Sequence, residues 1–432
     1  MFLRASFTTE TVEIAQRTTE IRTKMTSIAI QEQVGSARFQ NALARRSQST
    51  PPIWLMRQAG RYHKHYQALR EKYSFMDLCK RPELAAEVAL GPVLDFDFDA
   101  AILFSDLLFP LEALGMGLEY TDRGPQLEWR LNEQTISQLR AVEEAWPHLL
   151  FQGDAVHATR ERLPSSRSLI GFIGGPWTLF AYAVEGSHKG SLIESKKLLE
   201  LFPRFCEVMI PLLARNIELQ MDSGAELVMI FDTAAGELSP NVFKAEIMPQ
   251  LRVLTEKVSF ESLPKEPRSG EMFMENQHEL PPGGSFRSET DSAFAHKWAQ
   301  REDGSDRFFK HRIPTGFFPE ASIGYYSKGT QVAHLRHALF TEGGCAGIGV
   351  DHCWDLGEAL HLFSRSFVQG NFDQALLLCE RAQLKRQLRC YLEPLVHHSR
   401  DGWVCGLGHG VLPGTPEDNV KLFVDTIRER CK

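Results

Sequence analysis

The chain has 432 residues, of which 43% are hydrophobic and 24% are charged, and its formal net charge is −7. This composition predicts a folded protein with a large core, and the acidic balance excludes the basic excess of a typical nucleic-acid-binding protein. No apolar run approaches the roughly 18 residues of a membrane-spanning helix, so we expect neither nucleic acid nor a membrane as a partner.

The N-terminal segment and the cysteines indicate in which cellular compartment the protein is expected. The first 30 residues mix arginine with glutamate and lack the apolar stretch of a secretory signal. We expect residues 1–35 to be a poorly ordered extension and residues 36–432 to form a single domain. The eight cysteines contain no C-x-x-C pair, which favours reduced thiols in the cytoplasm, with import into an organelle left open.

Short apolar runs recur along the chain, and each closes on a glycine or a polar residue. There are eight of them, at 51–56, 100–106, 168–175, 225–233, 321–329, 345–351, 366–371 and 403–410. Runs that are apolar on both faces are typical of parallel strands covered by helices. Eight strands alternating with helices predict an α/β fold, a (β/α)8 barrel of the TIM type, with a doubly wound open sheet as the alternative.

Helix-start signals occur between these runs. Pro82 lies in the first turn of segment 81–94, and Thr415 with Pro416 stands at the start of segment 415–429, with Thr415 as the expected cap. The apolar residues of the second segment recur at helical spacing and comprise Val420, Phe423, Val424 and Ile427.

Residues 261–312 break this pattern because they are rich in proline, glycine, serine and charge. A structureless connection of this length is unusual inside a compact domain. We therefore expect a flexible insertion in the barrel domain, and we favour a solvated loop over a lid that covers the site.

In a TIM barrel the active site lies at the carboxyl ends of the strands, which nominates the residues that follow each apolar run. These are Arg57, Arg61, Ser105, Asp106, Pro176, Trp177, Tyr182, Asp232, Thr233, Lys328, Asp351, Asn371 and His409.

The two arginines flank the short loop 58–60. Guanidinium groups bind carboxylates through paired hydrogen bonds, and Gly60 lets backbone N–H groups approach a ligand, so this loop predicts a carboxylate-binding site. The alternative is structural: Arg57 or Arg61 caps a helix or pairs with Asp106. Asp106 itself follows an apolar strand, where a charge is costly unless it is paired or hydrogen-bonded.

Motifs for other chemistries are missing from the sequence. The glycine-rich segments 171–186 and 406–410 lack the spacing of a phosphate or dinucleotide loop. H-x-C, H-E-x-x-H, C-x-x-C and G-x-S-x-G motifs do not occur. We therefore expect no metal site and no common hydrolase mechanism. His409 remains either a ligand-binding residue or a core histidine.

Eight segments, taken in order, closely resemble the uroporphyrinogen decarboxylase family. They are 51–62, 102–120, 171–186, 227–240, 326–329, 349–351, 368–373 and 407–420. The first, PPIWLMRQAGRY, is the most specific, and the resemblance extends from about residue 36 to the end of the chain.

The resemblance implies a fold and an activity. Members of the family are (β/α)8 barrels that remove the carboxyl groups of the four acetate side chains of uroporphyrinogen III, giving coproporphyrinogen III in haem biosynthesis. They use no metal or organic cofactor, because a protonated pyrrole serves as its own electron sink and the protein need only hold the substrate and stabilise the cation. We accordingly expect a homodimeric carboxy-lyase whose partner is a small tetrapyrrole.

The resemblance also implies roles for particular residues. Asp106 would accept hydrogen bonds from the pyrrole N–H groups and stabilise the positive ring. Arg57 and Arg61 would bind substrate carboxylates, and one of them would assist proton transfer. The remaining residues expected to bind substrate are Gln58, Ala59, Gly60, Tyr182, Thr233 and His409.

Some positions depart from the family pattern, namely Ala234, Ala235, His352 and Gly406, and the insertion is atypical. These departures leave a non-catalytic porphyrinogen-binding paralogue as an alternative function. A related corrinoid or thiol methyltransferase is the more distant alternative, because the H-x-C zinc motif of such enzymes is missing here.

Overall fold

The computed structural model describes residues 34–121, 124–261, 323–396 and 399–431. Nearly all of the predicted N-terminal extension, 1–35, and of the predicted insertion, 261–312, lies outside the described residues. The expectations about those two segments therefore stay predictions.

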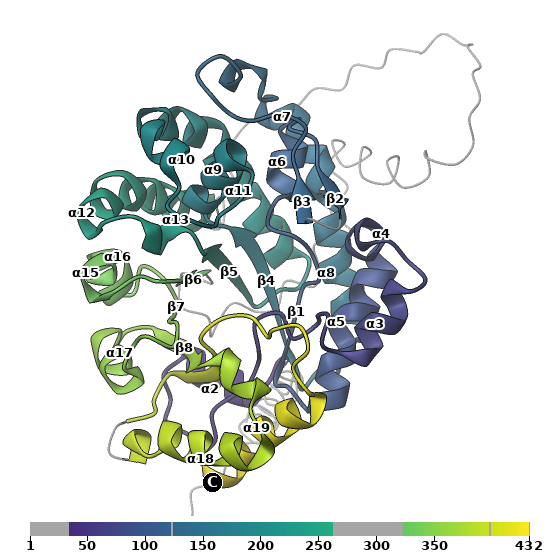
Figure 1. Cartoon of the computed structure of the whole chain (residues 1–432), viewed down its shortest axis with the longest axis vertical. Coiled ribbons are helices and arrows are strands. Elements are labelled where there is room, and N and C mark those ends of the chain that lie inside the picture. Colours follow the sequence, from purple (N-terminus) through teal and green to yellow (C-terminus); the bar gives the residue numbers. More distant parts are fainter. Residues whose placement is uncertain (1–33, 122–123, 262–322, 397–398, 432) are drawn as a thin grey trace, which may run out of the picture. The chain divides into compact units, whose positions relative to one another are not determined.

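The described part of the chain contains one curled parallel sheet of seven strands, in the order β1-β4-β5-β6-β7-β8-β9. The strands are β1 (Ala100–Ile102), β4 (Ser168–Gly174), β5 (Leu227–Asp232), β6 (Ile323–Ser327), β7 (Gly347–Gly349), β8 (Phe367–Phe372) and β9 (Trp403–Leu407). Every residue of these strands is buried, as expected for a sheet covered on both faces. Helices surround the strands (Figure 1).

The first predicted run, 51–56, lies between the two edges of this sheet. Ile53 forms an isolated parallel bridge with Cys405 of β9. On its other side, the Asp99 N–H next to β1 donates to the Ile53 carbonyl at 2.9 Å. All eight predicted runs therefore occupy consecutive positions around a ring, which confirms the TIM-type α/β fold, although the first run forms a bridge rather than a full strand.

The helices follow the strands in chain order. Before and after β1 lie α2 (Ala37–Leu43), α3 (Lys64–Arg70), α4 (Phe75–Lys80), α5 (Pro82–Phe96), α6 (Phe109–Ala113), α7 (Val142–Ala145) and α8 (Leu150–Arg162). Around β5 lie α9 (Pro176–Glu185), α10 (Ile193–Lys197), α11 (Phe202–Asp222), α12 (Pro240–Val242) and α13 (Met248–Glu261). After β6 come α15 (Val332–Leu335), α16 (Ala338–Thr341), α17 (Leu356–Leu362), α18 (Arg381–Leu392) and α19 (Glu417–Arg430).

Short helical turns fill several of the connections. They are η1 (Ile136–Gln138), η2 (Trp146–Leu149), η3 (Leu199–Leu201), η4 (Ala235–Glu237), η5 (Phe243–Ile247), η8 (Gln374–Leu378) and η9 (Pro394–Val396). None of the described helices is both long and apolar enough to cross a membrane.

Two helix predictions can be compared with the structure. Helix α5 begins at Pro82, as its sequence predicts. Helix α19 buries its predicted apolar face, but its N-cap is Pro416, so the expected Thr415 cap is wrong. The Thr415 hydroxyl is buried without a partner among the described residues, because the helix starts one residue later and leaves this side chain behind.

A hairpin that the sequence analysis did not predict follows α6. It pairs β2 (Glu119–Thr121) with β3 (Gly124–Gln126), and Tyr120 lies opposite Pro125. Both strands are short and partly exposed, so they lack the apolar pattern that indicates a buried strand.

The amino-terminal end of the barrel holds a buried polar network. The Ser168 hydroxyl donates to Glu226 at 2.8 Å and accepts the Ser36 N–H at 3.0 Å. Asp99 forms an ion pair of 2.9 Å with Arg38. These residues join α2 to the starts of β1, β4 and β5, and polar residues at this end of a barrel serve stability.

Candidate active site

The loop after the first run is fixed to the neighbouring strand by Gln58. The buried Gln58 side chain accepts the Leu55 N–H at 3.1 Å and donates to the Ala100 carbonyl of β1 at 3.0 Å. The Tyr62 hydroxyl donates to the Gln58 carbonyl at 2.8 Å. The loop is thus held beside β1 by a side chain and a hydroxyl that need not touch a ligand themselves.

Both arginines of this loop are exposed. Neither forms an ion pair with any residue that the structure describes, so the alternative in which one of them pairs with Asp106 is wrong. Between them, Ala59 and Gly60 are half-buried. Arg57 has φ 60°, a left-handed backbone conformation that is costly for a residue with a Cβ atom and that also occurs at Arg45, Asp97 and Leu192.

Asp106 follows β1 and is half-buried. One of its carboxylate oxygens accepts the Leu108 N–H at 2.9 Å. Burial raises the pKa of Asp106 above its ordinary value, while the Tyr120 hydroxyl, the Leu108 N–H and the charge of Arg57 act in the opposite direction. The carboxylate is therefore desolvated but surrounded by groups that favour its ionised form.

The unpredicted hairpin contributes Tyr120 to this environment. Its ring packs against Phe75 with centroids 4.5 Å apart, and Phe75 packs against Phe104, the residue two positions before Asp106, at 5.9 Å. The Tyr120 hydroxyl is buried and has no partner at full hydrogen-bonding geometry among the described residues, yet it is close enough to Asp106 to lower the pKa of that carboxyl.

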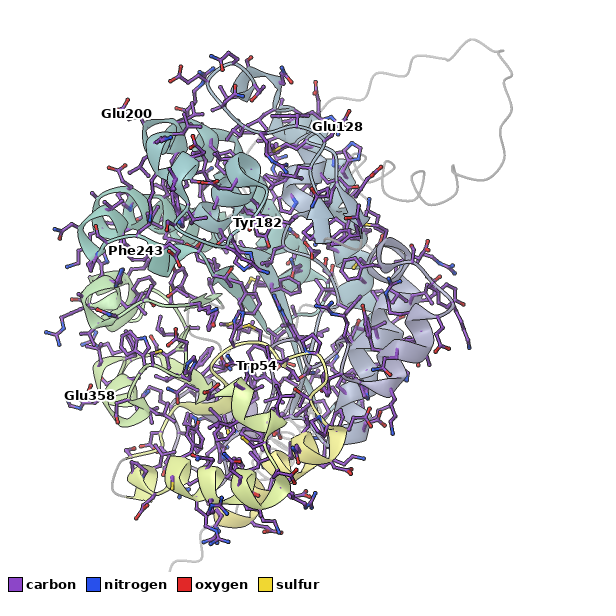
Figure 2. All side chains as sticks on the ribbon, viewed as in Figure 1. Trp54, Glu128, Tyr182, Glu200, Phe243 and Glu358 are labelled. Atoms are coloured by element: carbon purple, nitrogen blue, oxygen red, sulfur yellow. The ribbon has the colours of Figure 1, made fainter. Side chains whose placement is uncertain are left out.

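The charge of Arg57 influences three of the other predicted site residues. Its positive charge works to lower the pKa of Asp106 after β1, of Tyr182 in α9 and of His409 after β9. The Tyr182 side chain is half-buried and lies inside the ring of helices (Figure 2). The structure therefore brings together Arg57, Asp106, Tyr182 and His409 from four places in the chain.

His409, which follows β9, is held by a tyrosine of β6, a strand that is not its neighbour in the sheet. Tyr326 of β6 donates to the Gly408 carbonyl at 2.7 Å, and its hydroxyl is 3.0 Å from His409 Nδ1. Burial, followed by the charges of Arg57 and Lys328, lowers the pKa of His409 to about 3, so the ligand-free imidazole is neutral. His409 is half-buried, and its role as a ligand-binding residue stays a prediction.

A glycine makes room for Arg57 beside His409. A Cβ atom on Gly410 would lie 2.4 Å from Cδ of Arg57. Gly406, where the family commonly has asparagine, is equally confined: a Cβ atom there would lie 2.7 Å from the Trp54 carbonyl oxygen. The local packing explains both glycines, including the one that departs from the family pattern.

Asp232 serves the fold, unlike Thr233 and Arg61. Asp232 is buried and accepts the Thr178 N–H at 2.9 Å, the Thr178 hydroxyl at 2.7 Å and the Tyr325 hydroxyl at 3.2 Å. Thr233 beside it is half-buried, and its side chain forms no hydrogen bond with a described residue. Burial raises the pKa of Tyr66, and the charge of Arg61 is among those that work in the opposite direction. No interaction in the described chain ties Arg61 to Asp106.

Four more nominated residues are occupied by structural contacts. Ser105 accepts a hydrogen bond from Gln152 at 2.7 Å, and the Trp177 indole donates to the Ala234 carbonyl at 3.2 Å. Asp351 accepts the Gly329 and Cys353 N–H groups, and Asn371 donates to the carbonyls of Asp351 and Trp354. Lys328 is exposed, and its positive charge contributes, after burial and Arg57, to lowering the pKa of His409.

Sequence reasoning missed two residues of this site, Tyr120 and His188. His188 follows α9 and lies 2.5 Å from the Tyr182 hydroxyl through Nδ1. Neither residue ends an apolar strand, so the strand-end rule could not nominate it. The only sequence signal was position, because each lies at or just beyond the end of a segment that carries the family resemblance.

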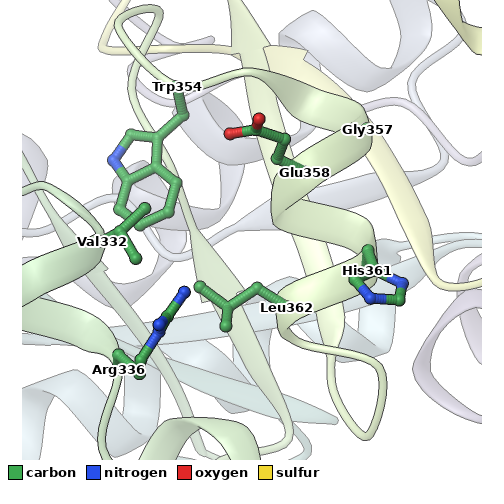
Figure 3. A pocket seen from close by; sticks show the side chains of 7 residues that line it. All are labelled: Val332, Arg336, Trp354, Gly357, Glu358, His361 and Leu362. Carbon is green, nitrogen blue, oxygen red and sulfur yellow. The ribbon is translucent and has the colours of Figure 1, made fainter.

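Two features of the described chain bear on other functions, namely its possible metal ligands and a pocket away from the predicted site residues. The described residues contain no group of three or more His, Cys, Asp or Glu side chains that could hold a metal ion, and all eight cysteines are free. A pocket lies between α15 and α17, where Arg336, Trp354, Glu358 and His361 are among its lining residues (Figure 3). None of the predicted site residues lines it.

Sequence comparisons identify what the chain is similar to. A family model described as uroporphyrinogen decarboxylase (URO-D) matches residues 35–265 and 310–430. The chain is 30% identical to the uroporphyrinogen decarboxylase of Gloeobacter violaceus over 386 residues, which cover 88% of this chain and 93% of that protein. It is 31% identical to the uroporphyrinogen decarboxylase of Thermus thermophilus over 387 residues, 88% of this chain and 94% of that protein.

A comparison with solved structures concerns the fold alone. A methyltransferase from Methanosarcina mazei superimposes with a TM-score of 0.62 at 16% sequence identity, covering 93% of this chain and 100% of that one. At this identity the likeness supports the barrel architecture and carries no information about the reaction.

Proposed function

The chain belongs to the uroporphyrinogen decarboxylase family, and we propose on that premise that it is a carboxy-lyase that converts uroporphyrinogen III to coproporphyrinogen III. One observation carries the proposal most directly. Arg57 is exposed and has no ion-pair partner in the described chain, and its charge acts on the desolvated carboxyl of Asp106.

The proposed binding mode divides these charges between the two parts of the substrate. Arg57 and Arg61, with the backbone of Gln58, Ala59 and Gly60, bind acidic side chains of the macrocycle, because guanidinium forks suit carboxylates. Asp106 accepts hydrogen bonds from pyrrole N–H groups, which are donors only. Tyr182, Thr233 and His409 complete the contacts to the remaining acids.

The proposed chemistry needs one proton and one stable carboxylate for each acetate group. A proton adds to a pyrrole carbon, and the ring becomes cationic. The bond between the methylene carbon and the carboxylate then breaks, CO2 leaves, and the bonding electrons neutralise the ring. A proton shift leaves a methyl group where the acetate was. The ionised Asp106 stabilises the cation, and its low-dielectric surroundings strengthen that interaction.

The activity can be tested with reduced uroporphyrinogen III under anaerobic conditions. We expect the purified protein to produce coproporphyrinogen III through intermediates with seven, six and five carboxyl groups, each resolved by chromatography after oxidation. Binding of the macrocycle without any loss of carboxyl groups would favour the non-catalytic paralogue instead. Treatment with a chelator is expected to leave the rate unchanged, because the proposed chemistry needs no metal.

Two further expectations belong to this proposal. We propose a cytoplasmic enzyme, supported by the eight free thiols, and a homodimer, supported by the family resemblance. Light scattering at micromolar concentration should give twice the mass of one chain. A single-chain mass at the concentration of the activity assay would contradict the dimer and leave the proposed reaction unaffected.

A further inference from the structure

His188 contacts a predicted substrate-binding residue although nothing assigns it a role. It lies in the connection between α9 and α10, and its Nδ1 atom is 2.5 Å from the Tyr182 hydroxyl. The two rings lie side by side, with centroids 5.1 Å apart and planes inclined by 43°. His188 is half-buried, so its imidazole is neither free in solvent nor part of the core.

The direction of this hydrogen bond depends on whether Nδ1 of His188 carries a proton. In its Nε2–H tautomer the neutral imidazole accepts at Nδ1, and the Tyr182 proton then points to His188, whereas the neutral Nδ1–H tautomer donates to the Tyr182 oxygen. A protonated imidazole donates from Nδ1 to the Tyr182 oxygen, and the Tyr182 proton becomes available to another acceptor. Tyr182 can donate a hydrogen bond to a substrate carboxylate only when Nδ1 of His188 carries a proton, and a protonated imidazole always carries one there.

The charges around His188 all oppose its protonation in the free protein. Burial, then Arg57 after the first run, Lys189 of its own loop and Lys328 after β6 lower the pKa of His188 to about 4. His188 in turn lowers the pKa of His409 after β9. Asp106 acts on Tyr182 and is not among the charges that act on His188.

A bound carboxylate reverses this balance. Placed beside Arg57 and Lys328, it would neutralise the cations that repel a proton from His188, and its own charge would attract one. We propose that His188 is a positioning residue that takes up a proton when a polycarboxylate macrocycle binds, and thereby turns the Tyr182 hydroxyl toward a carboxylate of that ligand. This inference rests on the proposed function for the identity of the ligand.

The proposal differs from simple packing of His188 against Tyr182. A packing role predicts an effect on affinity that is the same at every pH. Proton uptake predicts that affinity weakens as pH rises, because the bound state then has to acquire a scarcer proton. One linked proton changes the dissociation constant by up to about tenfold per pH unit.

The test uses coproporphyrinogen III, which has no acetate groups left to lose, as an anaerobic binding probe. Calorimetry in two buffers of different ionisation enthalpy gives the number of protons taken up on binding, and parallel turnover of uroporphyrinogen III gives KM at pH 6, 7 and 8. His188→Asn is the informative variant, because an asparagine oxygen can accept from Tyr182 but cannot be protonated. His157→Asn, an exposed histidine of α8, is the matched control.

We expect the wild-type protein and His157→Asn to take up about one proton more than His188→Asn, and KM of the wild type to rise at least threefold from pH 6 to pH 8. The rise should be absent in His188→Asn, with the effect falling on KM more than on kcat. In a Tyr182→Phe background, changing His188 should no longer alter the pH dependence of KM.

Equal proton uptake by the wild type and His188→Asn would overturn the proposal. Uptake lost in His409→Asn but kept in His188→Asn would also overturn it, by assigning the proton to His409. Turnover without this uptake rejects the role of His188 alone. Binding with uptake but no turnover rejects the proposed decarboxylation alone, and a wild type that neither binds nor turns over rejects both.

Discussion

Arg57 has a backbone conformation that the stability of the fold alone does not explain. Arg57 adopts φ 60°, a conformation that glycine accepts readily and that costs other residues about 1 kcal/mol or more. The exposed Arg57 side chain gains no ion pair in the described structure that would offset this cost. A role in binding a ligand explains why an arginine rather than a glycine occupies the position.

The strain at this position can be measured with two variants. Arg57→Gly and Arg57→Ala both lose the guanidinium, so each should raise KM for uroporphyrinogen at least tenfold. Only the alanine variant keeps a Cβ atom at positive φ, and it should be less stable than the glycine variant by up to about 1 kcal/mol in denaturant unfolding. An alanine variant as stable as the glycine variant would show that the backbone is not strained.

Tyr120 should tune the ionisation of Asp106. The proposed reaction requires the ionised carboxylate, so activity should fall as pH decreases through the pKa of Asp106. The Tyr120 hydroxyl lowers that pKa, and its removal in Tyr120→Phe should raise it and move the acidic limb of the kcat profile to higher pH by up to about one unit. Tyr73→Phe, outside the site, is the control. A limb at unchanged pH would rule out the Tyr120 contribution.

At the scale of elements, the residues that position the site are distinct from those that would bind substrate. Asp232 at the end of β5 holds the first turn of α9 through Thr178 and contacts β6 through Tyr325. Burial raises the pKa of Asp232 to about 6, against three hydrogen bonds that favour its charge. Because Tyr182 lies on α9, Asp232 contributes to the site by holding this helix in position.

Removing the hydrogen bonds of Asp232 should lower the free energy of unfolding more than it changes the catalytic rate of the folded protein. Asp232→Ala leaves three buried donors without an acceptor, and we expect a loss of about 3 kcal/mol in the free energy of unfolding. Asp425→Ala, on an exposed position of α19, should change it by less than about 0.5 kcal/mol. A normally stable Asp232→Ala protein that had lost activity would instead point to a direct role in the site.

The elements also show how far the sequence could predict this fold. The eight apolar runs were sufficient for the ring of strands, because parallel strands in a barrel are buried on both faces and leave a continuous apolar signal. The β2–β3 hairpin left no such signal, since its strands are short and partly exposed. The Thr415 cap was mispredicted because Pro416 was expected inside the helix, whereas it is the residue before it.

For the candidate site, the strand-end rule nominated Arg57, Asp106 and His409 because their positions follow from the barrel itself. It could not find His188 or Tyr120, whose contacts join a loop and a hairpin to residues distant in the sequence. It also could not separate ligand-binding groups from structural ones. Asp106 and Asp232 both end apolar strands, and only the hydrogen bonds of the folded protein show that Asp232 is fully occupied.

For the whole molecule, the amino-terminal end of the barrel predicts a dependence of stability on pH. Burial raises the pKa of Glu226 from 4.5 to about 7, against hydrogen bonds from Ser168 and Leu169 and the charge of Arg160. Between these two values the folded state binds more protons at Glu226 than the unfolded state. The contribution of this residue to the free energy of unfolding therefore decreases as pH rises through that interval.

The decrease should be at most about 3 kcal/mol, and Glu226→Gln should remove it. Urea unfolding of wild type and variant from pH 5 to pH 8 measures the difference, with Glu71→Gln as an exposed control. Parallel pH dependences for the wild type and Glu226→Gln would show that Glu226 keeps an ordinary pKa in the fold.

The proposed activity depends most directly on the charge of Asp106, and one comparison tests it. Wild type and Asp106→Asn are given uroporphyrinogen III anaerobically at the same pH, after unfolding curves have shown that both are folded. We expect the wild type to form coproporphyrinogen III and the variant to be slower by at least about 100-fold, because asparagine cannot stabilise the cationic ring. An Asp106→Asn protein that decarboxylates at the wild-type rate would contradict the role of this carboxylate.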